Sequence, residues 1–112
     1  MLIVDDDPDW REFLRTSLDE LGYESDEVAS GEEALRKVEA EPYRVMLLDL
    51  LMPGLGGEEV AKRLPTDGPQ VVFVTGAAAQ DAGHALSGGA HYYLPKGADR
   101  DALSLLLQSL GA

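Results

Sequence analysis

Four short apolar runs in this chain each stop at polar residues that are capable of chemistry. The runs are Leu2-Ile3-Val4 before Asp5-Asp6-Asp7, Val45-Met46-Leu47-Leu48 before Asp49, Val71-Val72-Phe73-Val74 before Thr75, and Tyr92-Tyr93-Leu94-Pro95 before Lys96. Continuous apolar runs of this length are typical of parallel strands that are buried on both faces. Ligands of open α/β sheets bind outside the carboxyl ends of the strands, so we predict that these polar residues meet in one cleft.

Amphipathic helices are predicted between these strands. In the first, Asp7 caps the helix, Pro8 occupies its first position and Gly22 ends it. Ser30 and Glu33 form a capping box for the second. The expected helices run from Pro8 to about Leu21, from Ser30 to before Pro42, over Glu58–Leu64, and from about Asp99 to Leu110, where Leu103, Leu106, Leu107 and Leu110 form one stripe.

The rest of the chain completes an alternation of strands and helices. Strands are expected over Tyr23–Ala29, at a charged edge of the sheet, and over Arg44–Asp49, Gln70–Thr75 and His91–Leu94. The segment Gly76–Gly89 predicts a poor, mobile helix, because each internal glycine costs about 1 kcal/mol relative to alanine. The 112 residues therefore form one α/β domain of five β-α units.

Composition excludes several classes of function. The chain has no cysteine, which excludes thiol catalysis and cysteine-bound zinc. Its formal net charge of -12 leaves no basic stripe for nucleic acid, so we expect no DNA binding by this domain. Neither a signal peptide nor a membrane span is recognisable, and we expect a cytoplasmic protein that does not bind membranes.

Four motifs together resemble the receiver domain of two-component response regulators. They are Ile3-Val4-Asp5-Asp6-Asp7, Leu47-Leu48-Asp49-Leu50-Leu51-Met52-Pro53, Val74-Thr75-Gly76 and Gly89-Ala90-His91-Tyr92-Tyr93-Leu94-Pro95-Lys96. The resemblance covers residues 1–112. It implies a doubly wound, five-stranded parallel sheet of the flavodoxin-like order 2-1-3-4-5, with five helices.

The acidic residues at the strand ends indicate a divalent cation. Asp6 and Asp49 would repel each other at short range unless a cation lies between them. Mg²⁺, or Mn²⁺, suits a site of carboxylates, waters and an incoming phosphate. The resemblance implies that Asp6 is a direct ligand, that Asp5 acts through water, and that Asp49 and the backbone carbonyl of Leu51 complete the protein's ligands.

Asp49 is the candidate phosphoacceptor. A carboxylate oxygen that attacks a phosphoryl group forms an aspartyl phosphate. Lys96 could bind one phosphoryl oxygen as a flexible point charge, and the Thr75 hydroxyl could donate to another. The resemblance further implies that Tyr93 is an aromatic switch residue, which turns inward when Thr75 is drawn to the phosphate.

The expected function is a signalling switch that accepts a phosphoryl group and is not itself an enzyme. A sensor histidine kinase or phosphotransfer protein would supply that group, and the face formed by residues 76–110 would bind an output partner or a second copy. One alternative is a pseudo-receiver that takes no phosphate. Another is a phosphatase of the haloacid dehalogenase type, for which Asp5-x-Asp7 would be the motif, although this chain has no cap to enclose a substrate.

Overall fold

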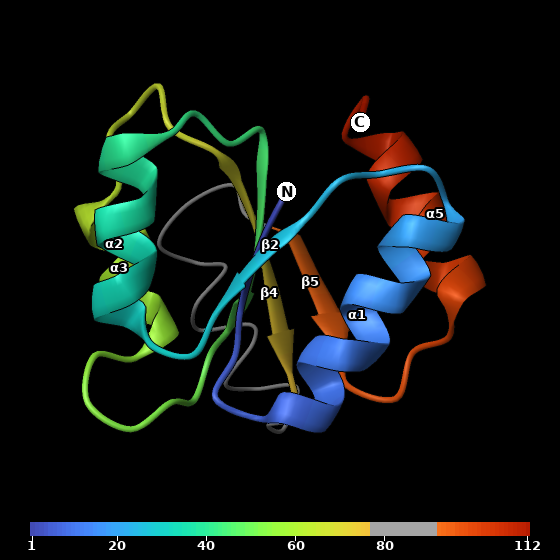
Figure 1. The fold of residues 1–112 in the computed structure, drawn as a ribbon, viewed down its shortest axis with the longest axis horizontal. Coiled ribbons are helices and arrows are strands. Elements are labelled where there is room, and N and C mark those ends of the chain that lie inside the picture. Colours follow the sequence, from blue (N-terminus) through green and yellow to red (C-terminus); the bar gives the residue numbers. More distant parts are fainter. Residues whose placement is uncertain (77–91) are drawn as a thin grey trace.

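The computed structural model describes residues 1–76 and 92–112, apart from the side chain of Thr75. Within these residues the chain forms a five-stranded parallel sheet (Figure 1). The strands are β1 (Leu2–Val4), β2 (Asp26–Val28), β3 (Val45–Asp49), β4 (Gln70–Thr75) and β5 (Tyr92–Pro95). Their order is β2-β1-β3-β4-β5, which confirms the predicted flavodoxin-like topology.

Four of the five predicted helices lie within the described residues. They are α1 (Pro8–Glu20), α2 (Gly31–Ala40), α3 (Gly57–Arg63) and α5 (Arg100–Ser109). In Figure 1, α2 and α3 lie on one side of the sheet, and α1 and α5 lie on the other. The predicted helix over Gly76–Gly89 falls outside the described residues from residue 77 onward.

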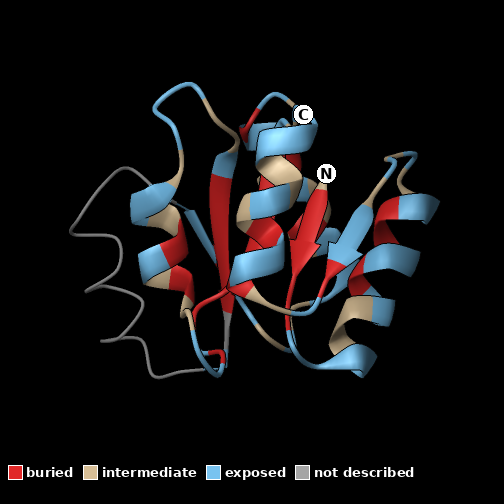
Figure 2. Cartoon of the chain, turned by 60° about the vertical axis from the view of Figure 1, so that its left-hand side comes forward, coloured by how far each residue is buried: buried red, intermediate tan, exposed pale blue. Residues whose placement is uncertain are grey.

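The strands divide their side chains between two hydrophobic cores. In β1, Leu2 and Val4 pack in the core beneath α2 and α3, whereas Ile3 packs in the core beneath α1 and α5. Figure 2 shows the central strands as almost continuously buried and the outer faces of the helices as exposed. This alternation explains why the strands read as unbroken apolar runs, since both faces of the sheet are covered.

The predicted helix caps are present. Asp7 accepts a hydrogen bond from the Asp9 amide, and Ser30 accepts one from the Glu33 amide. The Ser30 hydroxyl also donates to the Glu33 carboxylate at 3.1 Å, so the two side chains of the predicted capping box are in contact. At the far end of α1, Gly22 adopts a φ of 89°, a conformation that favours glycine.

The predicted bounds of the strands at the two edges of the sheet need correction, and β3 begins at Val45 instead of Arg44. The strand expected over Tyr23–Ala29 is only Asp26–Val28. Among the described residues it pairs with β1 alone, which has three residues and pairs from Leu2↔Asp26 to Val4↔Val28. At the other edge of the sheet, β5 continues through Pro95, whose position is opposite Thr75 of β4.

Candidate functional site

Three carboxylates meet at the carboxyl end of the sheet. Asp5 directly follows β1 and Asp49 ends β3, and the register of Val4 with Leu48 makes these two residues neighbours. Asp5 is 1% exposed and Asp49 is 3% exposed, whereas Asp6 is exposed to solvent. One carboxylate oxygen from each of the three lies within 4.8 Å of the other two. The predicted clustering of the acidic strand ends is therefore present.

Asp5 is held by both its backbone and its side chain. Its N–H donates to the carbonyl of Val28 at the end of β2, at 3.2 Å. Its Oδ1 accepts the Asp7 amide at 2.9 Å, so the side chain also stabilises the turn that leads into α1. The orientation of this carboxylate is thus fixed before any ligand arrives.

Lys96 places its ammonium group between the two buried carboxylates. It follows β5, and its Nζ lies 3.1 Å from Asp5 Oδ2 and 3.6 Å from Asp49 Oδ2. Partial burial lowers the pKa of Lys96, but the hydrogen bond to Asp5 and the charges of Asp49 and Asp5 outweigh it and raise that pKa. Lys96 therefore stays charged at neutral pH.

The pKa of the Asp49 carboxyl group is shifted far from its ordinary value. Burial, followed by the charge of Asp5, raises the pKa of Asp49 to about 7. Lys96 and the Leu51 amide, which donates to Asp49 Oδ1 at 3.3 Å, act in the opposite direction. Without a further cation, a substantial fraction of Asp49 is protonated at neutral pH.

The donor set fits a small, hard divalent cation. All three side chains offer carboxylate oxygens, which Mg²⁺ prefers. Within the described residues, Asp5 Oδ2 is buried and accepts no well-aligned hydrogen bond, so part of its capacity remains open to a cation. At Mg²⁺–oxygen distances of about 2.1 Å, adjacent ligand oxygens lie about 3.0 Å apart, so the three carboxylates, now within 4.8 Å of one another, would have to draw closer or bind the ion partly through water.

The other predicted site residues are only partly described. The backbone of Thr75 ends β4, but its side chain lies outside the described part of the structure, so the role of its hydroxyl stays a prediction. Tyr93 lies in β5 and is 38% exposed, and its role as a switch likewise stays a prediction. Leu51, predicted to offer its carbonyl, has an exposed side chain.

Gly57 supports the site but was not singled out from the sequence. A Cβ atom at this position would lie 2.3 Å from the carbonyl oxygen of Asp49 and 2.9 Å from Leu50 Cα. Only glycine therefore lets the start of α3 approach the end of β3 so closely. The adjacent pair Gly56-Gly57 after the predicted turn was the available signal.

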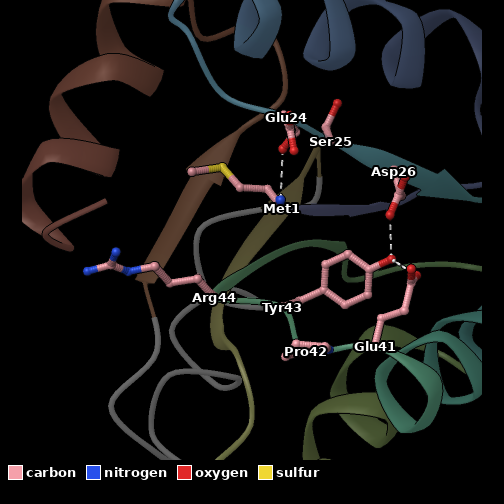
Figure 3. Close-up of a pocket in the computed structure, with 8 residues that line it drawn as sticks. All are labelled: Met1, Glu24, Ser25, Asp26, Glu41, Pro42, Tyr43 and Arg44. Atoms are coloured by element: carbon pink, nitrogen blue, oxygen red, sulfur yellow. Dashed lines mark hydrogen bonds between the residues drawn. The ribbon is translucent and has the colours of Figure 1, made fainter.

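A separate cavity of about 310 Å³ lies at the amino end of the sheet (Figure 3). Its lining includes the acids Glu24, Asp26 and Glu41, all of them exposed. The Tyr43 hydroxyl lies 2.5 Å from Asp26 Oδ2 and 2.8 Å from Glu41 Oε2. Burial and these hydrogen bonds raise the pKa of Tyr43. The cavity lies at the amino ends of the strands, whereas the acidic site lies at their carboxyl ends, so the two are separate.

Comparison with known proteins agrees with the geometry. Residues 1–108 match the family described as the response regulator receiver domain. The response regulator receiver protein CpdR of Brucella abortus is 35% identical over 81 residues, which cover 70% of this chain and 68% of CpdR. The transcriptional regulatory protein TcrA of Mycobacterium tuberculosis is 34% identical over 113 residues, which cover 98% of this chain but 45% of TcrA. The chain thus spans less than half the length of that relative.

Solved structures show the same fold. The response regulator TrrA of Thermotoga maritima, solved in complex with Mg²⁺-BeF, superposes with a TM-score of 0.85 at 32% identity, covering 97% of this chain and 96% of TrrA. The chemotaxis protein CheY4 of Vibrio cholerae gives a TM-score of 0.86 at 26% identity, covering 97% and 95% of the two chains. Among the described residues of this chain, every helix is too short or too polar to cross a membrane.

Proposed function

Since this chain belongs to the receiver domain family of response regulators and acts as a phosphoacceptor signalling switch, we propose that Asp49 is the residue that accepts the phosphoryl group. The observation that carries this proposal is the position of the Asp49 carboxylate, buried at the end of β3 with Lys96 Nζ 3.6 Å away. No other buried carboxylate among the described residues ends a strand of the sheet. Asp5 is also buried, but it follows its strand instead of ending it.

The proposed reaction is a single in-line displacement. An oxygen of ionised Asp49 attacks phosphorus, a new O–P bond forms, and the P–N bond of a phosphohistidine donor breaks. The imidazole nitrogen leaves with the electron pair and takes a proton from solvent. With a small acyl phosphate, a P–O bond breaks instead and the carboxylate of the donor leaves. Lys96 then binds one phosphoryl oxygen and stabilises its negative charge, and the Thr75 hydroxyl donates a hydrogen bond to another phosphoryl oxygen.

Mg²⁺, or Mn²⁺, is the proposed cofactor. Asp6 and Asp49 would hold it directly, Asp5 through water, and the Leu51 carbonyl would complete the protein's ligands. When bound, the ion neutralises charge on the carboxylates and on the transferring group. The acidic triad and the Mg²⁺-BeF complex of the relative TrrA support this proposal.

The proposed partners follow from the family. A cytoplasmic sensor histidine kinase or phosphotransfer protein would donate the phosphoryl group to the residue 1–112 domain. An output protein or a second copy of the chain would bind the face of residues 76–110, with Tyr93 as the switch residue that links it to the site. On that face Leu105 is 65% exposed and Tyr92 is 42% exposed, so apolar surface is available for a contact.

Incubation with acetyl phosphate and Mg²⁺ tests the assignment of Asp49. Mass spectrometry should detect one added phosphoryl group on the wild type and none on Asp49→Asn. Asp67→Asn is the matched control, because it removes the same charge from an exposed position. A wild type that takes no label would favour the pseudo-receiver. Substrate turnover by Asp49→Asn would instead favour a phosphatase that uses Asp5-x-Asp7.

A further inference from the structure

Arg11 makes an unusual contact with the loop that carries two of the acids. It lies on the first turn of α1, where its own N–H donates to the Asp7 carbonyl at 3.0 Å. Its side chain turns back, and Nη1 donates to the backbone carbonyl of Asp5 at 2.7 Å. The Nε of the same guanidinium donates to Glu27 Oε1 at 3.3 Å. The side chain is only 18% exposed, so these contacts are largely shielded from water.

The carbonyl of Asp5 belongs to the peptide bond that joins Asp5 to Asp6. A peptide group is planar, so fixing its oxygen restricts the Cα atoms of both residues. The N–H of Asp5 is independently held by Val28 at 3.2 Å. Arg11 therefore anchors the one peptide whose two ends carry two of the three clustered carboxylates.

Arg15 provides a natural comparison on the same helix. It pairs with the other oxygen of Glu27 at 3.1 Å, one turn further along α1. Its side chain is 54% exposed. The two arginines thus share one partner and one charge, but among the contacts that the structure describes, Arg11 is the one of the two that reaches the loop.

Charge alone and positioning predict opposite effects for Arg11. A cation beside a cation site repels the ion, so removing Arg11 would tighten metal binding if only its charge mattered. Glu27 offsets that charge across the 3.3 Å ion pair. If instead the planar guanidinium of Arg11 positions the loop, removing this side chain frees the Asp5–Asp6 peptide and weakens metal binding.

We propose that Arg11 is a positioning residue of the acidic site, which holds the Asp5–Asp6 peptide in the orientation needed for Mg²⁺ through a guanidinium bridge to Glu27. The inference rests on the proposed function, because it assigns Mg²⁺ to this site. Arg11 touches neither the cation nor the phosphoryl group. It acts through the backbone of Asp5.

Calorimetric titration with MgCl₂ tests the proposal on three variants. Arg11→Gln and Arg11→Lys should each weaken Mg²⁺ binding by about tenfold, since neither side chain can bridge the carbonyl and Glu27 as a planar fork does. Arg15→Gln, the matched control, should change the dissociation constant by less than about twofold. Urea unfolding in EDTA should show a cooperative transition for all three variants, which separates an effect on positioning from loss of the fold.

Amide exchange by NMR in EDTA provides a readout that needs no metal. The Asp7 amide donates to Asp5 Oδ1, so a loosened Asp5 should make it exchange faster in both Arg11 variants but not in Arg15→Gln. Wild-type Mg²⁺ affinity or tighter in Arg11→Gln, or unchanged exchange at Asp7, would overturn the proposal. A wild type that binds no Mg²⁺ would refute the proposed cofactor, while the exchange result would still decide the role of Arg11.

Discussion

Replacing Asp49 by asparagine should stabilise the metal-free protein relative to wild type, with a gain that grows as pH rises from about 5 to about 7 and levels off above neutral pH. Asp49 is 3% exposed and lies beside Asp5. Burial and the charge of Asp5 raise the pKa of Asp49 from 3.8 to about 7, against the opposing effect of Lys96. Asparagine keeps an oxygen that can accept the Leu51 amide, and it leaves Lys96 to pair with Asp5 alone.

The sign of the effect follows from the direction of the shift. The folded protein binds the Asp49 proton more tightly than the unfolded chain does. The stabilisation from this proton is therefore complete below about pH 4 and is lost as pH rises to about 7. The whole shift corresponds to about 4 kcal/mol, of which about 2 to 3 kcal/mol falls between pH 5 and pH 8. That loss is large beside a typical domain stability of about 5 to 15 kcal/mol.

Urea denaturation in EDTA, followed from about pH 5 to about pH 8, measures this difference for wild type and Asp49→Asn. The stability of the variant relative to wild type should increase across the range by about 2 to 3 kcal/mol. Asp67→Asn, at an exposed position, should show no such trend. A constant difference between wild type and Asp49→Asn, or a variant that is less stable at the upper end, would refute the assigned environment of Asp49.

Three further outcomes are expected. Mg²⁺ at a concentration of about one hundred dissociation constants should stabilise the wild type by about 2 to 3 kcal/mol. It should also change the fluorescence emission of the single tryptophan, which lies four residues past Asp6, and Asp6→Ala should lose both responses. Gly57→Ala should cost at least about 1 to 3 kcal/mol in urea denaturation because its Cβ would meet the backbone at 2.3 Å, whereas Gly56→Ala, with its nearest atom at 3.6 Å, should be nearly neutral. Beryllofluoride with Mg²⁺ should change hydrogen exchange within residues 76–110, and changes confined to the first two helices would contradict the proposed output face.

The strand ends could be predicted from sequence because each buried strand is a continuous run of apolar residues. Each apolar run lies where helices cover both faces of the sheet, and the first polar residue after it lies where the strand emerges from under the helices. Asp5, Asp49 and Lys96 were placed together on this reasoning, and the structure brings them within ion-pair distance. The flavodoxin-like order came from the resemblance, since periodicity alone does not say which strands are neighbours.

Features that depend on tertiary approach could not be predicted in the same way. The close approach behind Gly57 depends on where α3 meets β3, which no local pattern encodes. The contact of Arg11 depends on a side chain that turns back across its own helix cap to the Asp5 carbonyl. Lys96 was expected to reach a phosphoryl oxygen, and in the free protein it lies closer to Asp5 than to Asp49. Side-chain partners depend on how distant segments pack together, so the sequence alone does not reveal them.

Burial, rather than the number of acids, distinguishes the two acidic ends of the sheet. The amino end also gathers acids, but these are exposed, and the Tyr43 hydroxyl lies within hydrogen-bond distance of two of them, Asp26 and Glu41 (Figure 3). At the carboxyl end, Asp5 and Asp49 are buried and share the ammonium of Lys96, with Asp6 beside them. Three ionised carboxylates against one ammonium leave negative charge in excess where water is scarce, and a divalent cation offsets it. Burial and the charge of Asp5, which raise the pKa of Asp49, mark this end as the one where a cation would be stabilising, and a bound cation would lower that pKa and keep the proposed phosphoacceptor ionised.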